Sequence, residues 1–230
     1  MSHQRIIVAI DGPAGAGKST IAKSVAAKLG FVYIDTGAMY RAVALWALRA
    51  GIPETDIHKI EQLAAEAVIS FEAGSERVFL NGEDVTSAIR EPEVSAAASK
   101  VSAIAGVRRA MVEKQREMAS DGSVVMEGRD IGSVVFPDAR VKIFLDAPPK
   151  ERVHRRHREL HGRGLPADPN GTARELQERD HRDRTRAEAP LVQAPDAIYL
   201  DSGGLTIEQV EEQVLKIVRE RTANGREYSR

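Results

Sequence analysis

The sequence predicts an α/β fold in which helices flank a mostly parallel β-sheet. Short apolar runs alternate with amphipathic segments along most of the 230 residues, which is typical of strand–helix–strand units. The apolar runs have the length of strands, and the amphipathic segments repeat their apolar residues at helical spacing. Apolar residues make up 42% of the chain, which at this length is enough for one domain with a buried core.

The predicted elements follow this alternation in chain order. We expect five strands in the sheet, at Arg5–Ile10, Phe31–Ile34, Ser123–Met126, Val141–Leu145 and Ala197–Leu200. We expect helices at Lys18–Leu29, Ala38–Ala50, Val107–Ala119, Pro149–Leu160, Ala173–Ala187 and Thr206–Thr222. The last of these places Val210, Val214 and Ile217 on one face, as a helix that covers a sheet requires.

Two stretches interrupt the alternation. Val68–Phe71 and Arg77–Leu80 have the composition of strands. Asn81-Gly82 is a strong two-residue hairpin signal, and it leads into Glu83–Val85. These segments predict a small β-sheet inserted into the α/β core. The second stretch, His161–Gly171, is rich in glycine, proline and charge, and we expect an exposed mobile loop there.

Composition excludes several classes of function. The net charge is −1, and the basic residues lack the interleaved aromatic residues of a nucleic-acid groove. The chain has no cysteine, which excludes disulfides, thiolate nucleophiles and cysteine-ligated metals. No signal peptide or membrane-spanning run is recognisable. We therefore expect a cytoplasmic protein with no nucleic-acid or membrane partner, and we expect a monomer.

The first predicted strand is followed by a glycine-rich motif. Gly12-Pro13-Ala14-Gly15-Ala16-Gly17-Lys18-Ser19 fits the pattern Gly-x4-Gly-Lys-Ser and leads into the first predicted helix. The glycines let backbone N–H groups turn toward an anion, and the helix N-terminus adds partial positive charge. Lys18 can reach the outer phosphates of ATP, and the Ser19 hydroxyl can coordinate Mg²⁺. A glycine-rich turn without a ligand is the alternative, but the complete pattern in this context favours ATP.

Two further polar clusters follow predicted strands. Asp35 and Thr36 come after the second strand, and Arg41 stands one turn into the following helix. Glu127–Gly132, with the sequence Glu-Gly-Arg-Asp-Ile-Gly, follows the third strand. Taken singly, a helix N-cap and a solvated loop would account for them. Ligands of open α/β sheets bind at the carboxyl ends of strands. Together with the glycine-rich motif, polar clusters follow three of the predicted strands, which indicates a second binding region beside the ATP loop.

Arginine is dense on both sides of the predicted mobile loop. Ten arginines lie before, within or after it: Arg152, Arg155, Arg156, Arg158, Arg163, Arg174, Arg179, Arg182, Arg184 and Arg186. Acidic residues are interleaved, so part of this segment is expected to be salt-bridged helix surface. The remainder suits two polyanions held in line, because guanidinium groups bind phosphates bidentately.

The acceptor chemistry follows from the absence of an obvious general base. A phosphomonoester has a second pKa near ~6, so at neutral pH it is already largely dianionic and nucleophilic. A phosphate acceptor therefore needs no base. Asp35 could serve as the base for a hydroxyl acceptor, which keeps that class of acceptor open.

Taken together, these motifs closely resemble those of the bacterial cytidylate kinases. The resemblance covers nearly the whole chain and is carried by Ile10–Thr20, Asp35–Arg41, Leu80–Thr86, Ile89-Arg90, Glu127–Gly132, Val134–Ala139, Lys142–Ala147, Glu178–Arg184 and Ala189–Leu191. It implies transfer of the γ-phosphate of ATP to CMP or dCMP, with Mg²⁺ as cofactor. The combination is far more specific than the ATP loop alone.

The resemblance also implies an architecture. It is a P-loop kinase three-layer core with a five-stranded parallel sheet, a helical lid and a small inserted antiparallel β-sheet in the CMP-binding region. Residues 1–230 then form a single domain. Its core is 1–35, 105–150 and 190–230, its CMP-binding region is about 36–104, and its lid is about 151–189.

Site residues are transferred from the family position by position. The ATP-binding set is Gly12, Pro13, Ala14, Gly15, Ala16, Gly17, Lys18, Ser19, Thr20, Arg155 and Arg156. The CMP-binding set is Thr36, Arg41, Ser99, Arg108, Arg129, Asp130, Arg179, Asp183 and Arg186. The resemblance makes Lys18, Arg129 and Arg186 catalytic and Ser19 the Mg²⁺ ligand.

The chemistry of this set suits cytosine. Asp130 and the Ser99 hydroxyl can accept hydrogen bonds from the amino group, and Arg108 can donate to the ring acceptors. Uracil would place a carbonyl oxygen against Asp130 and leave buried polar groups unpaired. Arg41 and Arg129 suit the phosphate of CMP, and Asp183 and Arg179 suit the ribose hydroxyls.

Two alternatives stay open. Another small-acceptor kinase of the same architecture, of the adenylate, shikimate or gluconate type, would share the ATP loop. A non-catalytic nucleotide-binding regulator would have the loop and no acceptor pocket. The spacing of His154, His157 and His161 would suit a metal site, but surface or phosphate-facing histidines on a helix are the simpler interpretation.

Overall fold

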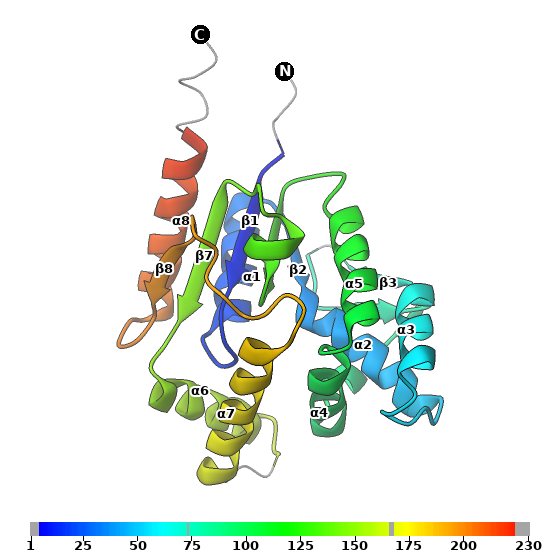
Figure 1. The fold of residues 1–230 in the computed structure, drawn as a ribbon. Coiled ribbons are helices and arrows are strands. Elements are labelled where there is room, and N and C mark those ends of the chain that lie inside the picture. Colours follow the sequence, from blue (N-terminus) through cyan, green and yellow to red (C-terminus); the bar gives the residue numbers. More distant parts are fainter. Residues whose placement is uncertain (1–4, 73, 166–167, 224–230) are drawn as a thin grey trace.

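A five-stranded sheet lies at the centre of the computed structural model, which describes residues 5–72, 74–165 and 168–223 (Figure 1). Every neighbouring pair of strands in this sheet is parallel. The strand order is β2-β6-β1-β7-β8, with bounds Ile7–Asp11 (β1), Val32–Asp35 (β2), Val124–Gly128 (β6), Val141–Asp146 (β7) and Ile198–Asp201 (β8). The five predicted strands are confirmed, and β1 lies in the middle of the sheet.

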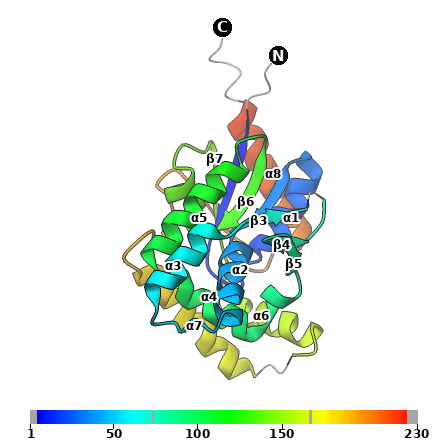
Figure 2. The ribbon, with the colours of Figure 1, turned by 90° about the vertical axis from the view of Figure 1, so that its right-hand side faces the viewer.

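Helices cover both faces of the sheet and give the predicted three-layer core (Figures 1 and 2). On one face pack α1 (Lys18–Leu29) and α8 (Ile207–Ala223). The other face is covered by α5 (Ala105–Met118) and by the π-helical turn η2 (Ile131–Val135). Because both faces are buried, residues 8–10 of β1 are all apolar and have no exposed surface. None of the helices in the described ranges combines the length and apolarity that a bilayer span needs.

The carboxyl ends of the parallel strands lie at one edge of the sheet, and two helices lie across that edge (Figure 1). They are α6 (Pro149–Gly162) and α7 (Pro169–Thr185), which pack against each other. A buried ion pair joins them, with 2.6 Å between Arg152 Nη1 of α6 and Asp180 Oδ2 of α7. These helices occupy the segment predicted as the lid, and we refer to them as the lid below.

A helical region with a small sheet lies beside the core. Its helical elements are α2 (Thr36–Arg49), α3 (Ile57–Glu66), the 3-10 turn η1 (Ala88–Arg90) and α4 (Pro92–Val101). Its sheet is antiparallel, in the order β3 (Ile69–Phe71), β4 (Val78–Leu80) and β5 (Glu83–Asp84). The predicted hairpin is confirmed, since Asn81 and Gly82 both have positive φ, 51° and 85°, as a type I′ turn requires.

The structure differs from the sequence prediction in local detail. α3 and α4 are not among the predicted helices. The loop predicted at His161–Gly171 is shorter, because α6 and α7 extend into it from both sides. Asp168 explains the early start of α7: its side chain accepts a hydrogen bond from the N–H of Gly171, and Pro169 takes the first helical position. Positions 166 and 167 of that loop lie outside the described residues.

Replacing Gly12 by alanine should destabilise the junction between β1 and the loop that follows it. Gly12 has a φ of 150°, and a Cβ atom there would lie 1.9 Å from the carbonyl oxygen of Leu145 in β7. The two strands would have to separate, so we expect the free energy of unfolding to fall by about 3 kcal/mol. Urea denaturation measures the change.

Gly122→Ala is the matched control, because no atom lies within 4 Å of the Cβ that this substitution adds. Its effect on the free energy of unfolding should stay below about 1 kcal/mol. Equal stabilities of the two variants would contradict the close approach of β1 and β7 at Gly12.

Candidate active site

The predicted phosphate loop runs from Gly12 to Gly17, between β1 and α1. Gly17 is the N-cap of α1 in the left-handed conformation (φ 93°), so the chain turns sharply into the helix. The N-terminus of α1 presents backbone N–H groups and the positive end of the helix dipole, which together favour a bound phosphate.

Two arginines of α6 hold the loop from the lid side. Arg152 Nη1 donates to the carbonyl oxygen of Ala14, and Arg155 Nη1 donates to that of Ala16, each at 3.1 Å. Arg155 also donates to the hydroxyl of Ser202, which follows β8, at 2.8 Å. The structure thus places the predicted residue Arg155 against the phosphate loop. It adds Arg152, which belongs to the dense arginines of the sequence but not to the predicted ATP-binding set.

Lys18 is the first residue of α1 and is buried. Its Nζ atom donates to the carbonyl oxygen of Pro13 at 2.7 Å, so the side chain lies folded over the loop. Burial and the neighbouring Arg129 guanidinium lower the pKa of Lys18 to about 7, while Glu127 and Asp11 act in the opposite direction. A phosphate in the loop would supply the counter-charge that the buried ammonium needs.

Glu127 lies near the end of β6, close to the start of α1. Its carboxylate accepts a hydrogen bond from the Tyr33 hydroxyl at 2.5 Å, and the neighbouring Ser19 hydroxyl acts to lower its pKa. Burial raises the pKa of Glu127, and the charge of Asp35 acts in the same direction. A serine hydroxyl beside carboxylate oxygens is the donor set that Mg²⁺ prefers, so the residues present fit the predicted cation.

Asp11 links the ATP loop to the neighbouring loop after β6. It ends β1, is buried, and accepts hydrogen bonds from the N–H groups of Ile131 (2.8 Å) and Gly132 (2.7 Å). Burial raises the pKa of Asp11 to about 6, although both hydrogen bonds lower it. This carboxylate therefore fixes the turn that carries Arg129 and Asp130.

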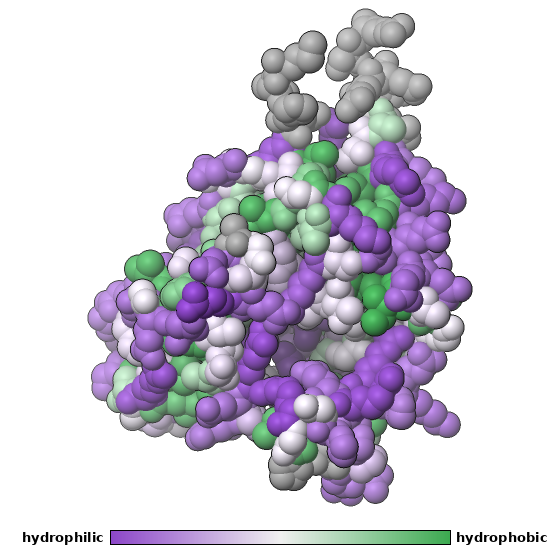
Figure 3. Space-filling view, turned by 180° about the vertical axis from the view of Figure 1, so that it is seen from behind, coloured by the Kyte–Doolittle hydropathy of each residue, from purple (hydrophilic) through white to green (hydrophobic). Residues whose placement is uncertain are grey.

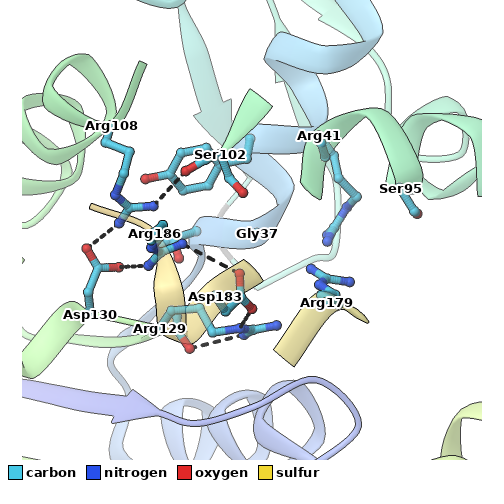
Figure 4. Close-up of a pocket in the computed structure, with 14 residues that line it drawn as sticks. Gly37, Arg41, Ser95, Ser102, Arg108, Arg129, Asp130, Arg179, Asp183 and Arg186 are labelled. Atoms are coloured by element: carbon cyan, nitrogen blue, oxygen red, sulfur yellow. Dashed lines mark hydrogen bonds and ion pairs between the residues drawn. The ribbon is translucent and has the colours of Figure 1, made fainter. Parts of the chain in front are cut away.

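A pocket lies next to the phosphate loop, between the core, α2, α4 and the lid (Figure 4). It is lined by Thr36, Gly37, Tyr40, Arg41, Ser95, Ala98, Ser102, Arg108, Gly128, Arg129, Asp130, Arg179, Asp183 and Arg186. From behind, the molecule is hollowed between its upper and lower parts, and the surface around the hollow is hydrophilic (Figure 3). Eight of the nine residues predicted to bind CMP line this pocket, although they come from four separate segments of the chain.

One wall of the pocket is a network of charges (Figure 4). Arg129 Nε lies 2.9 Å from Asp183 Oδ2, and Arg108 Nη2 pairs with Asp130 Oδ2. Arg186 lies between the two acids, 3.7 Å from Asp130 and 3.6 Å from Asp183. The side chains are almost entirely buried, so these pairs hold one another in position at the expense of their hydration.

The opposite wall carries Arg41 and Arg179, whose guanidinium groups lie next to each other (Figure 4). Arg41 Nη2 lies 2.8 Å from Asp35 Oδ2, and this pair lowers the pKa of Asp35 although burial opposes it. Within the described residues no carboxylate lies within 4 Å of the Arg179 guanidinium. Burial and the charge of Arg129 lower the pKa of Arg179 to about 10, so the residue remains a cation at neutral pH. This wall has the charge to bind an anion.

Two predicted site residues lie beside the pocket instead of lining it. The Ser99 hydroxyl accepts hydrogen bonds from Arg182 of the lid, at 3.2 Å from Nε and 3.1 Å from Nη2. Arg156 pairs with Glu159 at 2.9 Å and with Glu175 at 3.9 Å. Contact of Ser99 with cytosine would require Arg182 to release it.

The site also contains residues that sequence reasoning left out of the predicted set. Asp11 and Glu127 are acids within buried, otherwise apolar strands, and such acids need a polar partner or a ligand. That pattern was visible in the sequence and could have identified both. Arg152 and Tyr40 lay within the arginine-rich segment and the Asp35–Arg41 motif without being assigned a role, and Tyr33 carries no local signal, because its partner Glu127 lies far away in the chain.

A phosphate loop and an arginine-lined pocket on one edge of a parallel sheet define a nucleotide-dependent phosphotransferase of the P-loop kinase class. The chain belongs to the cytidylate kinase family, whose family model matches residues 8–220. It is 64% identical over 229 residues to a cytidylate kinase of Solibacter usitatus, covering 99% of this chain and 98% of that protein. It is 51% identical over 222 residues to a cytidylate kinase of Pelotomaculum thermopropionicum, covering 95% and 96% of the two chains.

One solved structure supports the fold independently of sequence. A crystal structure of an uncharacterized protein from Eubacterium ventriosum has a TM-score of 0.52 to this chain at 14% sequence identity, and covers 93% of this chain and 98% of its own. At that identity the likeness shows a shared fold. The specific family is carried by the sequence relatives.

The pH dependence of stability should reveal the buried state of Lys18. Its pKa is lowered in the folded protein, to about 7 from 10.5, so between these pH values the unfolded chain binds a proton that the folded protein does not. The contribution of Lys18 to stability therefore rises with pH through this window and is flat below it. We expect the stability of the wild type to rise relative to Lys18→Met between pH 7.5 and 9.5, measured by urea denaturation without nucleotide. Parallel pH profiles for the two proteins would contradict the lowered pKa.

Proposed function

We propose that the protein transfers the γ-phosphoryl group of ATP to CMP and dCMP, giving ADP with CDP or dCDP. The observation that carries the proposal is the juxtaposition of two anion sites, the Gly12–Ser19 loop and the arginine-lined pocket. Arg129 of the pocket lies close enough to Lys18 of the loop to lower its pKa. Membership of the cytidylate kinase family supports cytosine as the acceptor base.

On the donor side, the phosphate loop and the N-terminus of α1 bind the phosphates of ATP. Lys18 neutralises the outer phosphates, and the loop is held in its open turn by Arg152 and Arg155. Ser19 and Glu127 would hold Mg²⁺, which when bound neutralises part of the phosphate charge.

On the acceptor side, we assign Arg41, Arg129 and Arg179 to the phosphate of CMP and Asp183 to the ribose hydroxyls. Arg41 and Arg179 of one wall thus bind the anion together with Arg129 of the charge network, and we refer to the Arg108–Asp130 end of that network as the base-binding wall. At the base-binding wall, Asp130 accepts from the cytosine amino group and Arg108 donates to the ring acceptors. The depth of burial of both residues makes a mismatched uracil costly.

The chemical step is an in-line displacement that needs no general base. An oxygen of the CMP phosphate attacks the γ-phosphorus, and the bond from that phosphorus to the bridging oxygen of the β-phosphate breaks. Lys18, Arg129 and Arg186 neutralise the charge that spreads over the transferring group. The lid helices, through their contacts with the phosphate loop, exclude water that would otherwise hydrolyse ATP.

We further propose that three parts of the chain have different roles. Residues 36–104 bind the acceptor, 151–189 close over both substrates, and the remainder forms the core that binds ATP. Hydrophilic surface around the pocket and near-neutral net charge suit a cytoplasmic enzyme that works as a monomer on small nucleotides.

An ADP-release assay across acceptors tests the proposal. With ATP and Mg²⁺ we expect turnover on CMP and dCMP on the order of 10 s⁻¹, and much lower kcat/KM on UMP, AMP, shikimate and gluconate. Lys18→Met should lose roughly 100-fold or more of the activity, because it removes the cation at the outer phosphates. Preference for AMP or a sugar acid would identify a different kinase, and ATP binding without turnover would identify a regulator.

The Asp130→Asn variant tests how the base is read. The amide keeps the shape of the side chain but presents an N–H donor where cytosine also has a donor. We expect kcat/KM for CMP to fall roughly 100-fold and the ratio of UMP to CMP use to rise, with KM for ATP changed less than about threefold. Steady-state kinetics with both acceptors measures this. Unaltered CMP kinetics would remove Asp130 from the base site.

A further inference from the structure

A buried ion pair inside the lid connects the phosphate loop with the acceptor pocket. Arg152 in α6 and Asp180 in α7 are each 7% exposed, and Arg152 Nη1 lies 2.6 Å from Asp180 Oδ2. The same nitrogen donates to the carbonyl oxygen of Ala14 in the phosphate loop at 3.1 Å. A guanidinium Nη atom carries two hydrogens, so this one atom bridges the loop and α7. Asp180 itself has no part in the proposed reaction.

On the loop side, the contact fixes a peptide plane. The carbonyl group of Ala14 and the N–H of Gly15 belong to one trans peptide and point in opposite directions. Arg152 therefore directs the N–H of Gly15 to the other side of the loop. Gly15 has a φ of 76°, and a Cβ atom there would lie 2.9 Å from the backbone carbonyl oxygen of Arg152. The loop and α6 are thus also in close backbone contact.

On the α7 side, Asp180 adjoins two residues of the pocket. Arg179 precedes it, and Asp183 stands three residues further along, on a neighbouring part of the helix surface. Both of these residues line the pocket (Figure 4), and Asp183 lies 2.9 Å from Arg129. The place of Asp180 therefore determines how α7 presents its charges to the acceptor.

The chemistry of the pair is unfavourable for a purely structural contact between two helices. Both side chains lose their hydration, and apolar residues of similar volume would pack α6 against α7 at least as well. Oδ1 of Asp180 is also buried, and it has no hydrogen-bond partner within the described part of the chain. An arrangement that costs stability and bridges two binding sites indicates a role in binding.

We propose that Arg152 and Asp180 are positioning residues that hold the acceptor-binding face of α7 in place relative to the phosphate loop. ATP in the loop orders the peptide that Arg152 contacts, and Arg152 in turn holds Asp180. Each substrate therefore orders part of the site of the other, and the second substrate binds more tightly than it would alone. The inference rests on the proposed function, since it takes the loop as the ATP site and the pocket as the CMP site.

The double variant Arg152→Met with Asp180→Leu tests the inference. It removes both charges together and keeps the volume, so the lid helices should still pack. Calorimetric titration gives the Kd of CMP alone and with Mg²⁺ and a saturating ATP analogue whose β- and γ-phosphates are joined by an imido bridge. For the wild type we expect CMP to bind about tenfold more tightly with the analogue, and for the double variant less than about twofold.

Kinetics provide a second measurement on the same variant. We expect kcat at saturating ATP and CMP to fall roughly 30-fold, because the two phosphates are no longer held in the geometry of attack. The Kd of CMP alone should stay within about threefold of the wild-type value, since the double variant changes no residue that lines the pocket.

Arg49→Gln with Glu83→Gln is the matched control. Arg49 Nη1 lies 2.9 Å from Glu83 Oε2, so this ion pair also joins two elements, α2 and β5, but neither residue lines the pocket. Its coupling and its kcat should equal those of the wild type. Should the double variant of the lid fail to fold, Asp180→Asn decides, because the amide keeps the shape of the side chain and removes its charge. We expect the tenfold coupling to fall to about threefold or less in Asp180→Asn.

The outcomes separate this inference from the proposed function. A wild type without turnover on CMP would remove the proposed function and the inference with it. An active wild type that binds CMP equally well with and without the ATP analogue would overturn the inference alone. The same holds if the double variant loses thermal stability yet keeps the coupling, because the pair would then only join the lid helices. Lost coupling at unchanged thermal stability would support the inference.

Discussion

Mutual repulsion among guanidinium groups is the constraint on which this site depends. Five arginines line one pocket: Arg41, Arg108, Arg129, Arg179 and Arg186. Three aspartates neutralise most of this charge and fix the side chains, Asp35 beside Arg41, Asp130 beside Arg108, and Asp183 beside Arg129. The positive charge that these aspartates leave unpaired is concentrated on Arg179, whose pKa is lowered by burial and by neighbouring arginines. A polyanionic substrate relieves that repulsion, so the same arrangement that costs stability provides affinity.

The parallel sheet is what brings the donor and acceptor sites together. β1 lies between β6 and β7, so the phosphate loop that follows β1 lies next to the loop that follows β6. Asp11 ties these two loops by accepting two N–H groups from the second loop. The lid then contacts both sites, because Arg152 and Arg155 hold the phosphate loop while α7 contributes charges to the pocket.

Much of the fold could be predicted from local pattern. Buried parallel strands are almost continuously apolar, and the Asn81-Gly82 turn needs positive φ at both residues, so each of these leaves a sequence signal. The loop predicted at His161–Gly171 is longer than the observed one. The reason is that an N-cap residue such as Asp168 is hard to tell from ordinary loop composition in a sequence.

By itself, the sequence determined the phosphate loop, the order of strands and helices, and the identity of the charged residues, because these depend on neighbours within a few positions. Only the tertiary structure decided which charges meet. It placed the Arg182 guanidinium against the Ser99 hydroxyl, and it placed the Tyr33 hydroxyl where it donates a hydrogen bond to the Glu127 carboxylate. It also left Arg179 without a carboxylate within 4 Å in the described residues. Pairing between residues far apart in the chain is set by the packing of whole helices and strands, and no local spacing records it.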